Sequence, residues 1–358
     1  CQADFKVSSA NVAVTASSLD QALAASIPAL TGDPRPFQVL DANGALLGYD
    51  PELSDAELTS MYGWMVFGRQ LDERGLQLQR QGRVGVWGPM VGQEAVQVGL
   101  GLALRPGDWV FPSYRECLTL CVQGLDLIDL FAYFRGLYWP GDPERSGAFP
   151  IQIVIGDQSL HAVGAGMGFA FQHQPRVAVG VIGDGATSEG DFLEALNFSG
   201  VFNAQTVLLV QNNQWAISMP RSGQTASATL AQKGLAQGVT SVLVDGNDAL
   251  AVYAVCRWAI ERARQRQGPA LIEALTYRIG AHTTADDPRR YQPPEEIADW
   301  RKRDPIPRLR ADLERRGLWT AETERAMIAD ALARIDAAIA EAEARPIPPL
   351  EAYIQTAT

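Results

Sequence analysis

The sequence predicts an α/β protein built on a doubly wound parallel sheet with flanking helices. Short apolar runs rich in β-branched residues alternate with segments of helical periodicity between residues 107 and 278, and this alternation is typical of parallel α/β sheets. Several runs end in glycine or polar turns, at the edge where such sheets bind ligands. The chain has 358 residues, of which 47% are hydrophobic and 20% charged, so it can bury a large core.

The central segment, residues 177–218, shows the alternation most clearly. The apolar run 177–182 has the length and the β-branched content of a strand, and the sequence GDG breaks it at 183–185. Helical spacing follows, with Thr187 and Ser188 as candidate N-caps. A second apolar run at 207–210 ends in the polar tract QNNQ. Strand, helix and strand in this order predict a βαβ unit with parallel strands.

Asp184 and Asn213 each follow the carboxyl end of one of these two strands. If the strands are neighbours, their spacing of about 4.8 Å places the two side chains roughly 5–10 Å apart. A carboxylate, an amide oxygen, a backbone carbonyl and two phosphate oxygens suit an octahedral Mg²⁺. We therefore expect a metal and phosphate site at this edge, with the N-terminus of the helix that starts near Thr187 directed at the phosphate.

The other elements follow in order along the chain. Residues 1–35 lack a clear period and predict an extension of uncertain order. Ser54 and Glu57 form a capping-box pattern at the start of a long helix. Strands are expected at 37–40, before a turn at 41–44, and at 109–112, 151–155, 242–244 and 270–278; further helices are expected from Gln93 to about 105 and at 117–135, 160–171, 250–264 and 322–345. The last of these reads as a solvated or subunit-contacting surface helix.

These elements predict three divisions of the chain. Residues 1–50 form an extension with a short strand and turn, 51–320 the α/β domain, and 321–358 a C-terminal helix and tail.

Three candidate site residues have two interpretations from local sequence alone. Tyr114 and Arg115 follow a strand, so they form either a surface turn or a phosphate clamp. His282 lies in a loop at the same edge and is either simply exposed or a phosphate ligand able to assist proton transfer. His161 lies on an apolar helix, where a hydrogen-bonded core histidine is expected.

Composition excludes several classes of partner. The net charge of −11 and the lack of a basic stripe argue against nucleic acid. No apolar run approaches the roughly 20 residues of a membrane span, and no signal peptide is recognised, so a cytoplasmic location is expected. The four cysteines show no disulfide framework, and Cys117 and Cys121 are expected to be buried thiols rather than a zinc site.

Separated motifs give the chain a specific family resemblance. They are RQGR (80–83), GQEA (92–95), FPSYRE (111–116), GDGATSEGD (183–191), QNNQWAIS (211–218), VDGND (244–248) and YRIGAHTTADDP (277–288). The 26 residues between Gly185 and Asn212 fall within the spacing of the thiamine diphosphate motif. Over roughly residues 36–320 the chain resembles the alpha subunit of the first, decarboxylating component of 2-oxo acid dehydrogenase complexes, of the pyruvate or branched-chain type.

This resemblance implies that thiamine diphosphate and Mg²⁺ are bound. It implies that Asp184 and Asn213 ligate the metal through side chains and Trp215 through its backbone carbonyl. Tyr114, Arg115 and His282 would contact the diphosphate, and His282 would also be the catalytic residue. The other implied cofactor-binding residues are Gly183, Gly185, Ala186, Thr187, Ala216 and Ile155, the last as the apolar residue that holds the cofactor bent.

The same resemblance implies an oxidoreductase that works with partners. In the family a beta subunit supplies the glutamate that tunes the cofactor, so we expect a heterotetramer of two alpha and two beta chains. It would decarboxylate a small 2-oxo acid and pass the acyl group to a lipoyl acyltransferase core. The loop at 135–141 lacks the histidine that many relatives carry. Two alternatives therefore stay open: transfer of a two-carbon unit from acetoin or a ketose phosphate, and a non-catalytic paralogue subunit.

Overall fold

A five-stranded parallel sheet forms the centre of the protein in a computed structural model, which describes residues 18–23, 35–137, 143–349 and 351. The spatial strand order is β1-β2-β3-β7-β6, and every neighbouring pair is parallel. The strands are β1 (Trp109–Phe111), β2 (Ala178–Gly183), β3 (Thr206–Asn212), β6 (Thr240–Asp245) and β7 (Ala270–Leu275), and β4 (Trp215–Ala216) pairs separately with β5 (Met219–Pro220). The predicted fold class is therefore confirmed.

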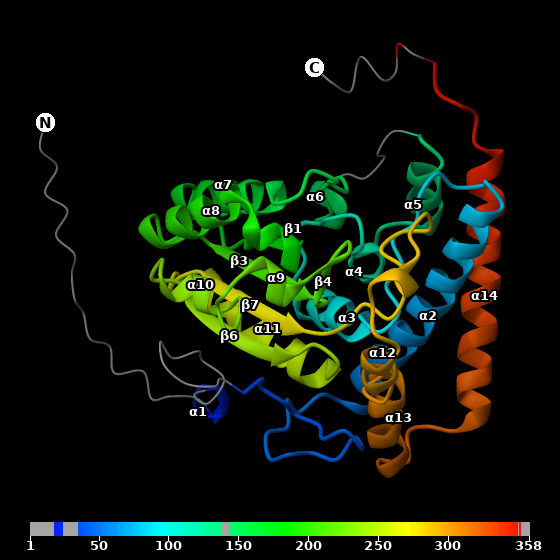
Figure 1. Cartoon of the computed structure of the whole chain (residues 1–358), viewed down its shortest axis with the longest axis horizontal. Coiled ribbons are helices and arrows are strands. Elements are labelled where there is room, and N and C mark those ends of the chain that lie inside the picture. Colours follow the sequence, from blue (N-terminus) through cyan, green and yellow to red (C-terminus); the bar gives the residue numbers. More distant parts are fainter. Residues whose placement is uncertain (1–17, 24–34, 138–142, 350, 352–358) are drawn as a thin grey trace, which may run out of the picture.

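Helices cover both faces of the sheet, and a further group stands beside it (Figure 1). Helices α7 and α8 pack on one face and α3 and α11 on the other, while α2, α13 and α14 form the group at the side. The helices are α1 (Ser18–Leu23), α2 (Asp55–Arg80), α3 (Glu94–Ala103), α4 (Cys117–Val122), α5 (Leu127–Phe134), α6 (Pro143–Ser146), α7 (Asp157–Phe171), α8 (Gly190–Val201), α9 (Arg221–Gln224), α10 (Gln232–Leu235), α11 (Ala249–Arg264), α12 (Pro294–Arg301), α13 (Pro305–Arg315) and α14 (Ala321–Ala344), with 3-10 turns at Asp184–Ser188 and Pro288–Arg290.

Side chains of the central strand alternate between the two faces. Leu208 and Val210 of β3 belong to the apolar cluster under α7 and α8, whereas Val207 and Leu209 belong to the cluster under α3 and α11. A strand buried on both faces needs apolar residues at every position, because successive side chains point to opposite sides. This explains why the sequence shows an unbroken apolar run there.

Helix α14 packs on the protein's own core through one face. Its buried residues are Ala331, Ile335, Ala338, Ile339 and Ala342, which face α2 and α5. The spacing of these residues matches one stripe of an amphipathic helix. The prediction of a solvated surface helix at 322–345 therefore holds for the outer face of α14, but not for the face that packs on α2 and α5.

The strand predicted at 151–155 is wrong. These residues form an irregular segment, and Ile153, Val154 and Ile155 are 61%, 64% and 43% exposed. Side chains rather than a neighbouring strand satisfy the segment's carbonyls, since Gln158 Nε2 donates to the oxygens of Gln152 and Val154 at 2.9 and 3.2 Å. A short β-branched run does not distinguish a buried strand from an exposed apolar segment.

Two other predicted local structures also differ. Thr187 and Ser188 do not cap α8, because residues 184–188 form a 3-10 turn and α8 begins at Gly190. The Thr187 hydroxyl instead donates to the Asp184 carbonyl at 2.8 Å. The strand predicted at 37–40 is reduced to two isolated bridges, Phe37 to Val244 and Leu40 to Leu46.

Burial was predicted for two cysteines and one histidine, and the structure confirms it for the cysteines only. Cys117 and Cys121 are buried in α4, as predicted. The expectation that His161 is a core residue is wrong. Its side chain is 52% exposed on the outer face of α7 and lies 3.4 Å from the Asp157 carboxylate.

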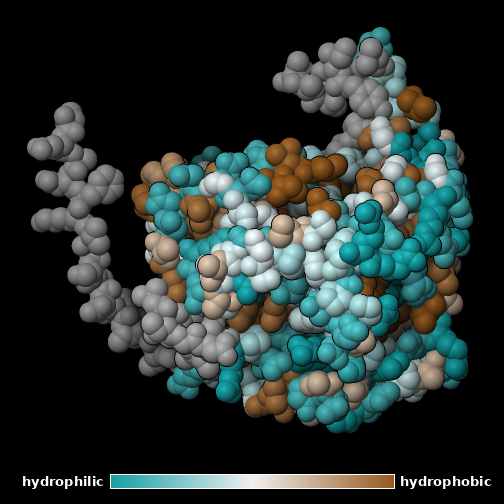
Figure 2. Space-filling model, viewed as in Figure 1, coloured by the Kyte–Doolittle hydropathy of each residue, from teal (hydrophilic) through white to brown (hydrophobic). Residues whose placement is uncertain are grey.

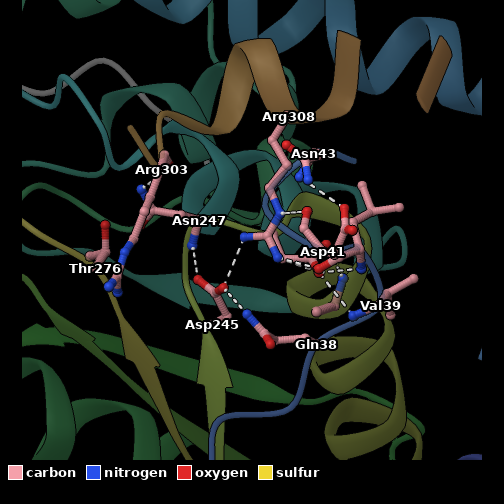
Figure 3. A network of polar contacts seen from close by, with 12 residues as sticks. Gln38, Val39, Asp41, Asn43, Asp245, Asn247, Thr276, Arg303 and Arg308 are labelled. Carbon is pink, nitrogen blue, oxygen red and sulfur yellow. Dashed lines mark hydrogen bonds and ion pairs between the residues drawn. The ribbon is translucent and has the colours of Figure 1, made fainter. Parts of the chain in front are cut away.

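The VDGND motif anchors the chain rather than lining a cavity (Figure 3). The buried guanidinium of Arg308, from α13, donates to Asp245 at 2.8 Å and to Asp248 at 3.3 Å. It also donates to the carbonyls of Leu40 and Asp41. Asp248 accepts the amides of Val39 and Leu40 at 2.8 and 2.7 Å. One arginine thus joins α13, the segment before α2 and the end of β6.

The surface is divided between polar and apolar regions (Figure 2). Polar residues dominate over α2 and α14, while apolar patches gather over the half that carries α7 and α8. On those two helices and the turn after α8 the exposed apolar residues are Leu160, Phe171, Leu193, Phe198, Val201 and Phe202. Within the described part of the chain, no helix combines the length and apolar content needed to cross a membrane.

Candidate functional site

A cavity of about 240 Å³ opens at the carboxyl edge of the sheet, beyond β2 and β3. It is lined by Ser113, Tyr114, Arg115, Glu116, Ile155, Gly156, Gln158, Gly183, Asp184, Gly185, Ala186, Glu189, Gln211, Asn213, Trp215, Ala216, Ile217 and His282. Every residue predicted from the sequence to bind the cofactor or metal lines this cavity except Thr187. That residue is buried within the 3-10 turn, where its hydroxyl and carbonyl accept hydrogen bonds from the Lys233 ammonium at 3.1 and 2.6 Å.

Asp184 and Asn213 reach the cavity from adjacent strands. In the β2–β3 register Gly183 lies opposite Gln211, so the two residues follow neighbouring strand ends. Asp184 is 2% exposed and Asn213 6%. Burial raises the pKa of the Asp184 carboxyl, and a hydrogen bond from Gln224 partly opposes that shift. A buried carboxylate needs a positive partner, because desolvation of an isolated charge is costly.

Two buried arginines supply positive charge next to this carboxylate. Arg115 donates to the carbonyls of Pro89 and His282, and Arg278 donates to those of Trp215 and Ile217 at 3.1 and 2.7 Å. Among the described residues neither guanidinium forms an ion pair with a carboxylate. Guanidinium groups held in place by neutral carbonyls keep their full charge for an anion. The site is therefore suited to a phosphate group.

His282 lies between these arginines. Burial lowers the pKa of its imidazole to about 4, with further lowering from Arg115 and Arg278 and an opposing effect from Asp286. Its Nδ1 is 3.3 Å from Arg278 Nη1, and its Nε2 is 3.4 Å from the Tyr114 hydroxyl. Because arginine can only donate, Nδ1 acts as the acceptor and the neutral ring carries its proton on Nε2. That proton points toward Tyr114.

We expect His282 to stay neutral until the pH approaches about 4 in the free chain. Its folded pKa lies below the unfolded value of about 6.5, so the unfolded chain binds the proton more tightly between these values. The contribution to stability is complete above about pH 6.5 and falls as the pH drops toward 4. Imidazole carbon-bound proton shifts in a pH titration by NMR measure this pKa, and a His282→Gln variant assigns the signal.

Adding pyrophosphate with Mg²⁺ to that titration should raise the midpoint of His282. An anion between the two arginines offsets their repulsion of the imidazolium and favours the charged form. A midpoint near 6.5 without ligand, or one that pyrophosphate does not move, contradicts the placement of His282 in an anion site.

The backbone around Trp215 is held in strained conformations. Gln214 has φ of +71° and Ile217 has φ of +53°, and a positive φ is a genuine outlier for β-branched isoleucine. Such strain persists only where surrounding contacts fix it, and it clusters at ligand sites. Here Arg278 fixes it by binding the carbonyls of Trp215 and Ile217.

Two glycines bring the backbone close to the cavity. A Cβ atom on Gly185 would lie 2.7 Å from the Cβ of Ala216, whereas one on Gly183 would meet no atom within 4 Å. Gly185 therefore permits contact with the β4 segment, and Gly183 leaves open space for a ligand to approach the main chain.

The oxygen donors present fit a hard cation. Asp184 offers a carboxylate, Asn213 an amide oxygen and Trp215 a carbonyl, and oxygen ligands completed by phosphate are typical of Mg²⁺. Within the described ranges no group of three or more His, Cys, Asp or Glu side chains could hold a metal. A metal site whose protein ligands include a single carboxylate is consistent with that result, because the phosphate groups of a bound ligand would supply further negative charge to the cation.

Several polar residues at the site were missed by sequence reasoning. Four buried polar atoms near the cavity have no hydrogen-bond partner: Gln93 Nε2, Glu116 Oε2, Gln211 Oε1 and Gln224 Oε1. Burial raises the pKa of Glu116 to about 7. Such atoms are rare in native proteins, and a bound water, ion or polar ligand is one explanation for them. Gln93, Glu116 and Gln211 lie within recognised motifs, but no sequence signal identifies Gln224.

Comparison with known proteins gives a consistent result. Residues 62–351 match the family model described as "Dehydrogenase E1 component". The chain is 43% identical over 311 residues to the pyruvate dehydrogenase E1 component subunit alpha of Staphylococcus aureus, covering 86% of this chain and 84% of that protein. It is 46% identical over 304 residues to the 3-methyl-2-oxobutanoate dehydrogenase subunit alpha of Mycobacterium tuberculosis, covering 84% and 83%.

Both relatives are alpha subunits of enzymes that act on 2-oxo acids, and their names imply a beta partner. The matched family uses thiamine diphosphate, and the cavity beyond the carboxyl ends of β2 and β3 is lined by a buried arginine of the kind that suits a phosphate group. The chain belongs to the dehydrogenase E1 component family, as the alpha subunit of a pyruvate or branched-chain 2-oxo acid dehydrogenase.

Proposed function

We propose that this alpha subunit holds the diphosphate of thiamine diphosphate through a Mg²⁺ ion. Asp184 and Asn213 would ligate the metal through side-chain oxygens and Trp215 through its carbonyl. Tyr114, Arg115 and His282 would bind the diphosphate, and Gly183, Gly185, Ala186 and Ala216 would pack against it. Thr187 would act only by supporting the turn. The observation that carries this proposal is that the buried Asp184 carboxylate and the buried Arg115 guanidinium line one cavity, while Arg278 binds the carbonyls of Trp215 and Ile217 in its wall.

The protein's own groups would bind and orient the cofactor. When bound, thiamine diphosphate supplies a thiazolium carbon that attacks the 2-oxo carbon and takes up electrons as CO₂ leaves. Arg115 would neutralise the diphosphate together with the metal, and Ile155 presents an apolar side chain from the cavity wall. As the proposed catalytic residue, His282 is neutral near pH 7 and can accept a proton or donate Nε2–H in a hydrogen bond.

A beta subunit would complete this site. The cavity of about 240 Å³ is smaller than the roughly 300–1,000 Å³ of a complete small-molecule pocket. The segment 153–155 and Ile217 at its rim are exposed and apolar, as are residues on α7 and α8. Apolar surface of this kind marks an interface. We infer a heterotetramer of two alpha and two beta chains that delivers the acyl group to a lipoyl acyltransferase core, in the cytoplasm.

We expect CO₂ release from a 2-oxo acid only when this chain is combined with a beta subunit. The assay uses the co-purified complex with Mg²⁺ and thiamine diphosphate, and compares pyruvate with 3-methyl-2-oxobutanoate. The chain alone should be inactive, because its cavity lacks the wall that the partner supplies.

The same assay separates the alternative donors. Turnover of acetoin or a ketose phosphate without release from any 2-oxo acid contradicts the proposal, and the absence of all turnover favours a non-catalytic subunit. The loop at 135–141 that motivated these alternatives lies partly outside the described residues, which omit 138–142.

A further inference from the structure

We propose that Gln93 and Gln224 are positioning residues that orient the two side-chain ligands of the cation, Asn213 and Asp184. This inference rests on the proposed function of the site. Neither glutamine lines the cavity, and each contacts one ligand directly.

Gln93 holds the amide of Asn213. This glutamine is fully buried at the start of α3. Its Oε1 accepts Asn213 Nδ2 and Gln211 Nε2, each at 3.1 Å. The two donors come from the end of β3, so a residue far away in the sequence fixes how that strand presents its side chains.

A backbone amide determines which atoms donate and which accept in this hydrogen-bond network. The Trp215 amide lies 3.3 Å from Asn213 Oδ1 and can only donate, so Oδ1 is on the Trp215 side. Nδ2 must then face Gln93, and Gln93 must present its oxygen. An Asn213 side chain without this acceptor could rotate its NH₂ group toward the cation, where no ligation is possible.

Gln224 holds the carboxylate of Asp184. It lies at the end of α9, and its Nε2 donates to Asp184 Oδ2 at 2.8 Å and to the Met219 carbonyl at 3.4 Å. Both partners can only accept, so the orientation of the Gln224 amide is also fixed. One carboxylate oxygen is thereby occupied, and the other is left for the cation.

Residues that orient metal ligands contribute strongly to affinity. Loss of such a partner typically weakens metal binding about 10–100-fold. We therefore expect Gln93→Met and Gln224→Met, which keep side-chain length but remove the amide, each to weaken Mn²⁺ binding about 10–100-fold. Mn²⁺ serves as the probe because electron paramagnetic resonance measures its free concentration directly, independently of catalysis.

Gln205→Met is the matched control. Gln205 is also buried, and its Nε2 donates to the carbonyls of Gln174 and Arg176 at 2.8 and 2.6 Å. It precedes the start of β3, at the end of the strand away from the cavity. This variant should lower the melting temperature without changing Mn²⁺ affinity. Melting temperatures of all variants without metal identify any that fail to fold.

Combining Gln93→Met with a substitution at Asn213 distinguishes an effect on the orientation of Asn213 from an effect on the stability of the fold. Asn213→Ala removes the side chain that Gln93 holds, so that no orientation of it remains to be lost. In this background Gln93→Met should cause no further loss of affinity, because residues that act through one another are not additive. A further loss of about tenfold would show that Gln93 acts through the fold.

The titrations use the full chain co-purified with a beta subunit, with thiamine diphosphate present. Tight Mn²⁺ binding by the unsubstituted complex with weakened binding in both glutamine variants supports the inference. Unchanged binding in the two variants, or an equal loss in Gln205→Met, overturns it while leaving the proposed function intact. If the unsubstituted complex binds no Mn²⁺, the proposed function itself fails.

Discussion

Replacing Asp184 by alanine should reduce binding of Mg²⁺ and thiamine diphosphate below detection. Asp184 is the one carboxylate assigned to the metal, and it lies 2% exposed in a cavity that Arg115 also lines. Without it the cation loses its charged protein ligand, and the remaining neutral oxygens cannot offset the loss of water. Isothermal titration with thiamine diphosphate and Mg²⁺ measures the change.

Asp191→Ala controls for the loss of an acidic residue in the same motif. Asp191 is exposed in the first turn of α8 and does not line the cavity, so binding should match that of the unsubstituted protein. Retained affinity in Asp184→Ala would show that the metal is held elsewhere.

Replacing Arg308 by methionine should lower the free energy of unfolding by about 3–5 kcal/mol, because removal of one partner leaves buried charges uncompensated. Arg308 joins Asp245 and Asp248 to the segment 40–41 (Figure 3). Burial already raises the pKa of the Asp248 carboxyl, and Arg308 is the largest opposing influence. Chemical denaturation followed by circular dichroism measures the change.

Arg289→Met tests whether the large loss of stability expected for Arg308→Met depends on the burial of the arginine. Arg289 pairs with Asp287 at 2.8 Å, but its side chain is 88% exposed, so this variant should leave the free energy of unfolding nearly unchanged. Equal losses in the two variants would contradict the role assigned to the buried network.

The sequence predicted the parts of the site that depend on strand order. An apolar run, a helix and a second apolar run require parallel neighbours, and parallel strands end at the same edge. The placement of Asp184 and Asn213 in one cavity follows from that rule. For Tyr114, Arg115 and His282 the local sequence left two interpretations open, and the family resemblance favoured the phosphate-binding one.

The sequence failed where side chains replace backbone pairing. Residues 151–155 have the composition of a strand, but Gln158 takes up two of the segment's carbonyls. Threonine is a preferred N-cap residue, but the Thr187 hydroxyl donates to the Asp184 carbonyl inside a 3-10 turn. Gln224 lies in a short helix outside every motif, so its contact with Asp184 could be seen only in three dimensions.

The most direct measurement is the anomalous scattering of Mn²⁺ in crystals of the complex with a beta subunit and thiamine diphosphate. We expect one manganese peak within ligation distance of the Asp184 carboxylate, the Asn213 amide oxygen and the Trp215 carbonyl, with diphosphate oxygens completing its shell. A manganese peak at any other place, or a diphosphate bound without contact to Arg115 and His282, would contradict the site described here.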